Sequence, residues 1–348
     1  MRKQRILIVD DSPLIRRILS DWIQAEFDLE LVGAAENGHE AIRLAEELKP
    51  DLITLDVEMP ECDGITALRA IMAARPTAVL MISSVTTKGA KSTLAAMEAG
   101  AYDFVTKPGG ASSVKFGCTK EEVLNKIRAG RYVRVGSPTT LKVTEKPAAV
   151  SIPSRSDKVV VIASSTGGPQ ALVRLWPNIP ANFPAPILIV QHMPAGFTDS
   201  FAKRLTKLGT VPCVEAKAGM TPEPGVAILA PGGYHMTLDA DGKIALDARP
   251  TIHGVRPAAD FLFETAAARF GSRLIGLVLT GMGKDGAAGA LQIKNSGGVV
   301  LGESADSCLV YGMPRAAMEL GAVSAEASID DLMSHVAGCL TKRGQNAA

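Results

Sequence analysis

The sequence predicts an α/β protein with two doubly wound parallel-sheet domains joined by a linker. Its 348 residues are enough for about two domains, each able to bury its own core. Short apolar runs alternate with stretches whose apolar residues recur at helical spacing, and this alternation is typical of parallel sheets flanked by helices. A long irregular stretch separates the two halves, and such a stretch is uncommon inside one compact domain.

The composition is that of an ordinary globular protein. Hydrophobic residues make up 47% of the chain and charged residues 21%, with a formal net charge of +1. This near-neutral balance offers no electrostatic basis for binding nucleic acid or a membrane surface. The five cysteines are scattered and form no C-x-x-C pair, which is typical of reduced thiols in a cytosol. No stretch approaches the roughly 20 apolar residues of a membrane span. We therefore expect a soluble, cytoplasmic protein without membrane insertion.

Residues 1–128 contain the first series of elements. The expected strands are the runs RILIVD, DLITLD, AVLMISS and DFVTKP. The expected helices are PLIRRILSDWIQ, GHEAIRLAEEL and KSTLAAMEAG, which carry apolar residues on one helical face.

Residues 129–157 are expected to form the linker. From Arg131 to Asp157 the chain has three prolines, four serines and no sustained period. The second domain then covers residues 158–340, and residues 341–348 are expected to be a frayed tail. The expected strands of the second domain are KVVVIASS, APILIVQ, VAILA and RLIGLVLT, and the expected helices are ALVRLW, ADFLFETAAARF and AAGALQIK.

Three carboxylates and a lysine follow strands of the first domain. Asp10 and Asp11 lie at the end of the strand RILIVD, Asp56 ends the strand DLITLD and Lys107 lies at the end of the strand DFVTKP. Because functional groups gather beyond the carboxyl ends of parallel strands, we expect these side chains to converge. The carboxylates would repel one another unless a divalent cation lay among them, and oxygen ligands of this kind suit Mg²⁺. Lys107 could then hold a phosphoryl group placed on one carboxylate. Alternatively, the paired acids cap a helix that begins at Pro13 and the lysine is merely solvated.

The first domain resembles the receiver domain of two-component response regulators. The resemblance lies in ILIVDDS, LITLDVEMPECDG and AYDFVTKP and covers essentially all of residues 1–125. It implies that Asp56 accepts a phosphoryl group from a histidine kinase, while Asp10 and Asp11 bind Mg²⁺.

The same resemblance implies roles for three further residues. Lys107 would contact the phosphoryl oxygens, Ser83 would take the position of the switch hydroxyl, and Phe104 that of the switch aromatic. Phe104 lacks the hydroxyl that some members carry, and this departure puts its switching role in question.

In the second half, the run VIASSTGGPQ at residues 161–170 fits either a phosphate-binding loop or a turn that presents a nucleophile. The lysine of a P-loop and the glycines of a dinucleotide fingerprint are both absent. The nucleophile-elbow pattern G-x-S-x-G fits when centred on Ser165, with alanine in place of the first glycine, but not when centred on Ser164. We therefore expect Ser165 to be the nucleophile, with amides at the following helix start facing a developing negative charge.

A serine nucleophile needs a base and an orienting carboxylate. Within the second domain, His192, His235 and His253 are the candidate bases. His192 directly follows the strand APILIVQ, so its position favours it. Asp285 lies in GMGKDG, beyond the strand RLIGLVLT, and would complete a triad.

Simpler interpretations of these residues remain open. A histidine is often a satisfied structural group, and GMGKDG could be only a tight turn. The second half would then be a non-catalytic output module that binds a partner or a nucleotide through its glycine loops.

The second domain resembles the catalytic domain of the chemotaxis protein-glutamate methylesterases, which also deamidate receptor glutamines. The resemblance covers residues 158 to about 325 and lies, in order, in ASSTGGPQAL, QHMPAGFTDSFAKRL, APGGYHM, VRPAADFLF, LTGMGKDGAAG and VYGMPRAAMELGA. It implies a hydrolase that acts on methyl-accepting chemoreceptors, needs no cofactor for ester hydrolysis, and is controlled by phosphorylation of its receiver.

Carried over to this chain, the resemblance assigns Ser165 as nucleophile, His192 as general base and acid, and Asp285 as the orienting carboxylate. It makes Thr166 and the backbone of Met282 candidates for stabilising the oxyanion. Two residues have no settled role: Ser164 stands where many members have alanine, and Arg256 either contacts an acidic receptor surface or is structural.

Overall fold

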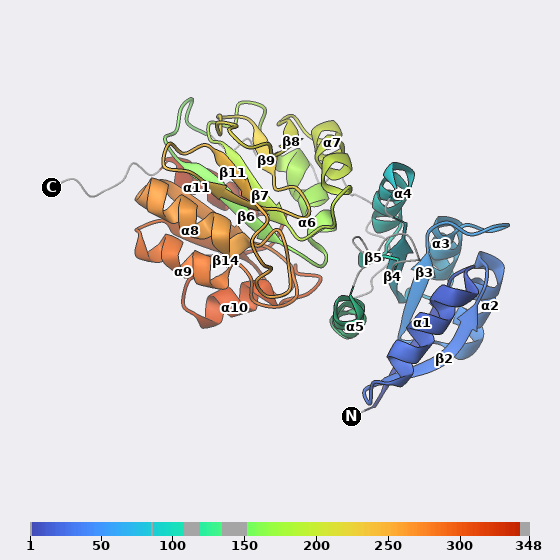
Figure 1. Ribbon diagram of the computed structural model, residues 1–348. Coiled ribbons are helices and arrows are strands. Elements are labelled where there is room, and N and C mark those ends of the chain that lie inside the picture. The colour runs from blue at the N-terminus through green and yellow to red at the C-terminus, as the bar shows by residue number, and fades with distance from the viewer. Residues whose placement is uncertain (1, 85, 108–118, 134–151, 342–348) are drawn as a thin grey trace. The chain divides into compact units, whose positions relative to one another are not determined.

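The computed structural model describes residues 2–84, 86–107, 119–133 and 152–341 (Figure 1). The chain divides into two compact units, Met1–Lys142 and Val143–Ala348. Each unit has a parallel sheet with helices, and the predicted fold class is therefore confirmed. Most of the expected linker at 129–157 and of the expected tail at 341–348 lies outside the described residues.

The first unit is built on a five-stranded parallel sheet with the order β2-β1-β3-β4-β5. Its strands are β1 (Gln4–Val9), β2 (Leu29–Ala35), β3 (Leu52–Asp56), β4 (Ala78–Ser83) and β5 (Asp103–Thr106). Its helices are α1 (Pro13–Gln24), α2 (Gly38–Leu48), α3 (Gly64–Ala74), α4 (Thr87–Glu98) and α5 (Lys120–Ala129). The strand order reverses between β1 and β3, and functional groups collect beyond the strand ends at such a reversal.

The start of α1 decides between two interpretations of the paired acids. Ser12 caps this helix, because its side chain accepts a hydrogen bond from the Ile15 amide at 3.5 Å. Asp10 accepts a hydrogen bond from the Ser12 amide at 2.9 Å, so it lies before the cap. The alternative in which Asp10 and Asp11 cap the helix that begins at Pro13 is therefore not supported.

The second unit is built on a seven-stranded parallel sheet with the order β14-β13-β12-β6-β7-β9-β8. Its strands are β6 (Val159–Ser164), β7 (Ile187–Gln191), β8 (Cys213–Glu215), β9 (Ala227–Leu229), β12 (Leu274–Val278), β13 (Val299–Glu303) and β14 (Ala325–Ala327). Its helices are α6 (Gly168–Leu175), α7 (Thr198–Leu208), α8 (Ala259–Phe270), α9 (Ala287–Asn295), α10 (Met313–Glu319) and α11 (Leu332–Thr341).

Some strands of this unit carry little signal in the sequence. β8 and β14 lie at the two edges of the sheet, have three residues each and both contain a glutamate, so no apolar run marks them. β10 (His235–Leu238) and β11 (Ile244–Asp247) form a separate antiparallel hairpin in addition to the predicted parallel sheet.

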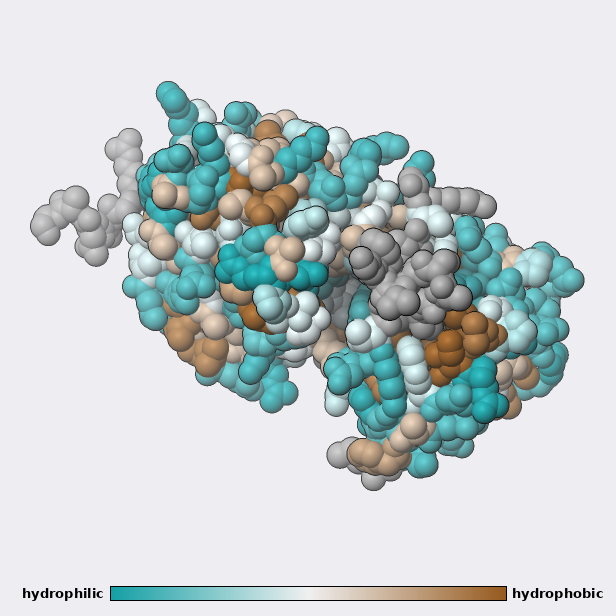
Figure 2. Space-filling model, in the orientation of Figure 1, coloured by the Kyte–Doolittle hydropathy of each residue, from teal (hydrophilic) through white to brown (hydrophobic). Residues whose placement is uncertain are grey.

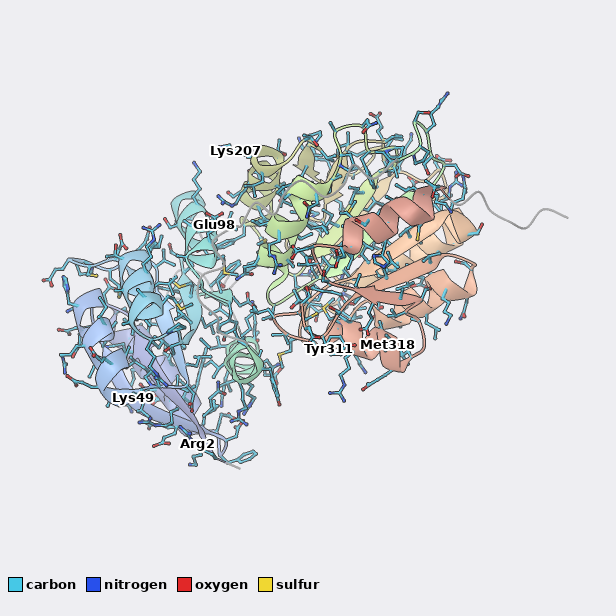
Figure 3. All side chains as sticks on the ribbon, turned by 180° about the vertical axis from the view of Figure 1, so that it is seen from behind. Arg2, Lys49, Glu98, Lys207, Tyr311 and Met318 are labelled. Atoms are coloured by element: carbon cyan, nitrogen blue, oxygen red, sulfur yellow. The ribbon has the colours of Figure 1, made fainter. Side chains whose placement is uncertain are left out.

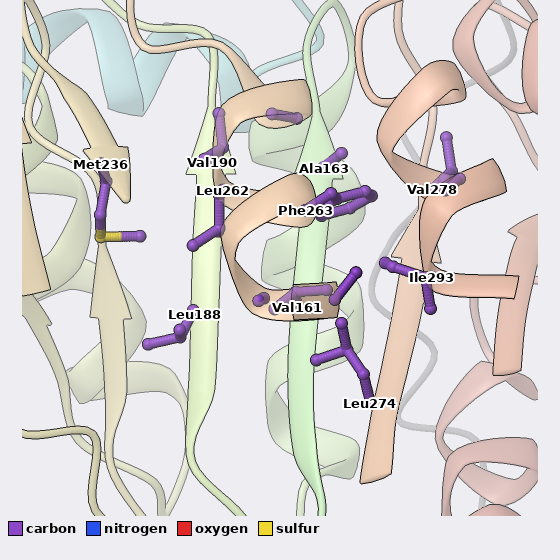
Figure 4. Packing of buried hydrophobic residues seen from close by; sticks show 14 of the residues in the cluster. Val161, Ala163, Leu188, Val190, Met236, Leu262, Phe263, Leu274, Val278 and Ile293 are labelled. Carbon is purple, nitrogen blue, oxygen red and sulfur yellow. The ribbon is translucent and has the colours of Figure 1, made fainter. Parts of the chain in front are cut away.

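A hydrophobic core between the large sheet and α8 stabilises the second unit. Val161 and Ala163 of β6 and Leu188 and Val190 of β7 alternate along their strands, so all four face the same side. Figure 4 shows α8 lying across these two strands, with Phe263 among their side chains. Phe263 is fully buried, and burial of one such side chain contributes about 1.5–3 kcal/mol. This packing holds the carboxyl ends of β6 and β7 side by side.

The outer surface of both units is largely hydrophilic on the face in view (Figure 2). Charged side chains such as Lys49 and Lys207 are exposed (Figure 3). Among the described residues, no helix has both the length and the apolar character needed to cross a membrane.

Candidate active site and phosphorylation site

The four polar residues predicted to converge in the first unit lie together beyond the strand ends. Lys107 Nζ is 2.8 Å from Asp56 Oδ2 and 3.2 Å from Asp10 Oδ1. It also lies 3.9 Å from an Asp11 carboxylate oxygen. Asp10 and Asp56 are fully buried, whereas Asp11 is exposed. Two buried carboxylates therefore share one lysine.

Burial sets the electrostatics of this cluster. It raises the pKa of Asp56 to about 6, with Lys107 opposing the shift and the charge of Asp10 adding to it. Burial also raises the pKa of Asp10. Burial lowers the pKa of Lys107, but the hydrogen bond and charge of Asp56 outweigh it and the net shift is upward. The cluster thus carries more negative charge than its one cation neutralises.

The same carboxylates fit a divalent cation. Asp10, Asp11 and Asp56 each offer an oxygen, and these oxygens lie within 4.8 Å of one another. Asp10 Oδ2 is buried and accepts no hydrogen bond among the described residues, although Lys107 Nζ lies 3.2 Å from it as an ion pair, so the oxygen keeps acceptor capacity for a metal ion. Hard oxygen ligands at this spacing suit Mg²⁺, which would neutralise the carboxylates and the oxygens of an incoming phosphoryl group.

The pKa of Asp56 makes the stability of the metal-free protein depend on pH. The pKa of Asp56 in the folded protein lies above the usual value of 3.8. The protonated Asp56 side chain therefore stabilises the folded state fully below pH 4, and this stabilisation is lost as the pH rises through about 6. We expect the unfolding free energy of the wild type, measured relative to that of Asp56→Asn, to fall by roughly 3 kcal/mol between pH 4 and pH 8. Denaturant unfolding of both full-length chains without Mg²⁺ measures it. A difference that is flat with pH would contradict the prediction.

The two expected switch residues are both buried. The Ser83 hydroxyl accepts a hydrogen bond from the Thr93 hydroxyl at 2.6 Å. The Phe104 ring lies 5.5 Å from Lys126 Nζ. Their switching roles stay predictions.

Ser165 lies in the turn between β6 and α6, at the carboxyl end of the large sheet. Its amide donates to the Thr280 carbonyl at 3.1 Å, and its own carbonyl accepts from the Gly168 amide at 2.7 Å. Gly167 has φ of +79°, a conformation that favours glycine, and it lets the chain turn directly into the helix. The Ser165 side chain is partly exposed and lies beside Gly281, where an added Cβ would come within 2.9 Å of Ser165 Cβ.

Gln191 secures this turn, a role that its local sequence does not predict. Its Oε1 accepts from the Ser164 hydroxyl at 2.7 Å, and its Nε2 donates to the carbonyls of Ser165 and His192, both at 3.0 Å. A Cβ at Gly168 would lie 2.0 Å from Gln191 Oε1, so only glycine fits there. The one available signal was a polar residue that ends an otherwise apolar strand. Ser164 is thus buried and structural, whereas Ser165 is partly exposed.

His192 follows β7, directly alongside Ser165. β6 and β7 are paired with Ser164 opposite Gln191, and the His192 amide donates to the Ser164 carbonyl at 3.0 Å. The next residue on each strand therefore emerges at the same edge. In the described part of the chain, the Ser165 hydroxyl and the His192 ring are not hydrogen-bonded to each other, and such contacts often tighten only when substrate binds.

Asp285 lies on the other side of His192 and is almost completely buried. His192 Nε2 is 2.7 Å from Asp285 Oδ2. Burial alone would raise the pKa of Asp285, but its hydrogen bond and charge interaction with His192, and the amides of Ala259 and Asp260, hold it below the usual value. The carboxylate is therefore ionised at neutral pH and accepts a hydrogen bond from the Nε2–H group, which leaves Nδ1 as the ring nitrogen without a proton in neutral His192.

The other two candidate bases have different partners. His235 is buried, with Nδ1 accepting from the Ala258 amide at 3.1 Å and Nε2 3.2 Å from the Pro250 carbonyl. Burial lowers its pKa, consistent with a neutral structural residue. His253 Nε2 lies 3.2 Å from Asp260 Oδ2.

Three other residues were predicted to contact the oxyanion or the receptor, and their hydrogen bonds in the structure differ. The Met282 amide donates to no other group in the described part of the chain, so it is available to an oxyanion. Thr166 is buried, and its carbonyl accepts from the Thr280 hydroxyl at 3.0 Å. Arg256 donates to the carbonyls of Ala248 and Arg249, at 2.8 and 2.9 Å, which favours the structural interpretation.

The fold and the two sites define a class: response regulators whose receiver domain is joined to an α/β enzymatic domain. The family model for the response regulator receiver domain matches residues 6–115, and that for CheB methylesterase matches residues 160–336. A relative from Symbiobacterium thermophilum, named protein-glutamate methylesterase/protein-glutamine glutaminase, is 43% identical over 335 residues and covers 92% of each chain. The chain belongs to this methylesterase/glutaminase family.

Further comparisons agree. A relative of the same name from Thermotoga maritima is 46% identical over 322 residues, covering 91% of this chain and 93% of the relative. The crystal structure of the Thermotoga maritima CheB methylesterase catalytic domain matches with a TM-score of 0.51 and 43% identity, over 52% of this chain and 97% of that chain.

Proposed function

We propose that the protein hydrolyses glutamyl methyl esters, and deamidates specific glutamines, on methyl-accepting chemoreceptors in the cytoplasm. The observation that carries the proposal is the 2.7 Å contact between His192 Nε2 and the buried, ionised Asp285 carboxylate, at the strand end next to Ser165. Family membership gives the class of substrate.

In the proposed mechanism, Ser165 Oγ attacks the ester carbonyl carbon while His192 Nδ1 takes the hydroxyl proton. Asp285 holds the ring and stabilises its positive charge. The amide of Met282, with Thr166 as a second candidate, would donate to the carbonyl oxygen as it becomes negative, and one such donor is worth about 10²- to 10³-fold in rate.

Collapse of the tetrahedral intermediate breaks the bond between carbon and the methoxy oxygen. His192 gives its proton to that oxygen, methanol leaves, and the glutamyl group remains as an ester of Ser165. Water then attacks the same carbon, gives a proton to His192, and releases the glutamate as the serine recovers its proton. A glutamine substrate follows the same steps and releases ammonia. No step requires a cofactor.

The direct test is to incubate the full-length protein with methylated receptor and measure methanol, and with receptor that carries the target glutamines and measure ammonia. Release of both supports the proposal. The competing possibility is a non-catalytic module that binds a partner or nucleotide. A serine-directed covalent reagent separates them, because an enzyme is labelled stoichiometrically at Ser165 and a binding module is not.

We also propose that a histidine kinase phosphorylates Asp56 and that this controls the hydrolase. The carboxylate lies 2.8 Å from Lys107, beside two further acids able to hold Mg²⁺. Phosphorylation would favour a receiver state that permits hydrolysis.

We expect a phosphodonor with Mg²⁺ to raise the methanol release rate of the full chain by about tenfold or more. Asp56→Asn should not respond, since it offers no carboxylate for phosphorylation. A shortened chain that begins at Lys158 should be active without a phosphodonor. Equal rates for the untreated full chain, the phosphodonor-treated full chain and the shortened chain would rule out this control.

A further inference from the structure

The Asp285 carboxylate occupies the N-terminus of α8 as well as contacting His192. Its Oδ2 accepts from the Ala259 amide at 2.6 Å and its Oδ1 from the Asp260 amide at 3.1 Å. Ala258, the residue before this helix, supplies no side-chain cap. Asp285 therefore provides the acceptor that the first turn of α8 would otherwise lack.

Asp260 makes the reverse contact with the next helix. Its Oδ1 accepts from the Gly289 amide, in the first turn of α9, at 2.8 Å. Gly286, at the start of α9, likewise supplies no side-chain cap. The two helices thus exchange carboxylates: Asp285, just before α9, caps α8, and Asp260, in the first turn of α8, caps α9.

This exchange requires the helices to pack closely. α8 and α9 lie side by side (Figure 1), and a Cβ on Gly289 would come within 2.5 Å of Phe263 Cβ. Asp285 is two residues before α9, with Gly286 at φ of +82° between them. A shift in the first turn of α9 would therefore move the Asp285 carboxylate directly.

The second oxygen of Asp260 faces His253, whose Nε2 lies 3.2 Å away and whose side chain is 33% exposed. The charged or titratable groups facing the Asp260 carboxylate are thus His253 from the preceding loop and Asp285 from the segment before α9. Burial, and then the charge of Asp285, raises the pKa of Asp260. The ionised form of Asp260 is therefore destabilised by burial and by Asp285, and the Gly289 amide and His253 offset part of this effect.

We propose that Asp260 is a positioning residue for the hydrolase: by capping α9, it fixes the segment that carries Asp285 and so holds that carboxylate on His192. The inference rests on the proposed function of Ser165, His192 and Asp285. It gives Asp260 no contact with substrate.

The test compares Asp260→Ala and Asp260→Asn in the full chain. Alanine removes the acceptor for the Gly289 amide, whereas asparagine keeps one oxygen there. We expect Asp260→Ala to lower kcat for methanol release by about 10²-fold, the scale of an ångström-level misplacement, with KM within about twofold. Asp260→Asn should recover most of that loss. The downfield proton NMR signal of the hydrogen bond between His192 and Asp285 should shift or vanish in the alanine variant and persist in the asparagine variant.

Ala266→Gly is the matched control, because Ala266 is buried in the middle of α8 and the change weakens the helix by about 1 kcal/mol without touching Asp285. It should lower the melting temperature and leave kcat and the NMR signal unchanged. The proposal would be overturned if Asp260→Ala kept the wild-type kcat, or if it lost activity while the NMR signal stayed unchanged. An equal loss of kcat in Ala266→Gly would also overturn it. None of these results bears on Ser165, whose own substitution tests the proposed function separately.

Discussion

Ser165→Ala is expected to abolish methanol and ammonia release together, with kcat falling by on the order of 10⁴- to 10⁶-fold. The reason is that both reactions pass through an ester on the same oxygen, and alanine offers no atom to form it. The side chain is partly exposed and its loss removes no hydrogen bond from the described residues, so folding should be unaffected. Methanol and ammonia assays on the purified variant, together with its melting temperature, measure both effects.

Ser164→Ala is the matched control for that result. The two serines are adjacent, but the Ser164 hydroxyl is buried and donates to Gln191 at 2.7 Å. Its removal should cost about 1 kcal/mol of stability and leave a working enzyme that still reacts with a serine-directed reagent. Full activity in Ser165→Ala, or loss of labelling only in Ser164→Ala, would assign the nucleophile to another residue.

Asp285→Asn is expected to lower kcat by about 10⁴-fold. An asparagine amide that turns its oxygen toward His192 must direct its NH₂ group toward a backbone amide of α8, where two donors would meet. If it turns the other way, its NH₂ group faces Nε2 and favours the tautomer with the proton on Nδ1, the nitrogen that accepts from the serine in the proposed mechanism. The first orientation disturbs the 3.1 Å contact with the Asp260 amide. The second disturbs the 2.7 Å contact with His192 and the 2.6 Å contact with the Ala259 amide.

Steady-state rates of methanol release check this prediction, with Asp241→Asn as the control. Asp241 is an exposed acid in the turn between β10 and β11, so its substitution should change neither rate nor stability. If Asp285→Asn hydrolyses the ester at the wild-type rate, the carboxylate has no part in the reaction.

Much of the architecture could be predicted because the buried strands of a parallel sheet appear in the sequence as short apolar runs. β6, β7 and β12 are fully buried apolar runs, and a polar residue follows each one closely. Since all three strands are parallel and adjacent, Ser165 and His192, which directly follow β6 and β7, emerge at one edge, and Asp285 lies in the loop that follows β12 at the same edge. The strands β8 and β14 could not be predicted in this way, because each contains a glutamate and neither lies within a longer apolar run, whereas the equally short β9 lies within VAILA.

The residues that complete the site were harder to predict. Gln191 ends β7 as a single polar residue, and nothing in the local sequence shows that it bonds to the carbonyls on both sides of the site. The sequence pattern distinguishes His192 from His235 only by position. Their hydrogen-bond partners distinguish them in the structure, because His192 contacts the Asp285 carboxylate and His235 contacts backbone groups.

Residue order along the chain was thus sufficient to predict two parallel α/β domains and the strand ends at which Ser165 and His192 lie, whereas the catalytic roles of Ser165, His192 and Asp285 stay predictions. The tertiary structure decided what that order left open: which imidazole nitrogen of His192 contacts Asp285, and how Asp285 and Asp260 exchange helix caps where α8 packs against α9. The physical reason is distance along the chain. The Asp285 contacts join residues 25 and 26 positions apart, and hydrogen bonds of that span depend on how helices meet in space, which a local pattern of apolar and polar residues does not encode.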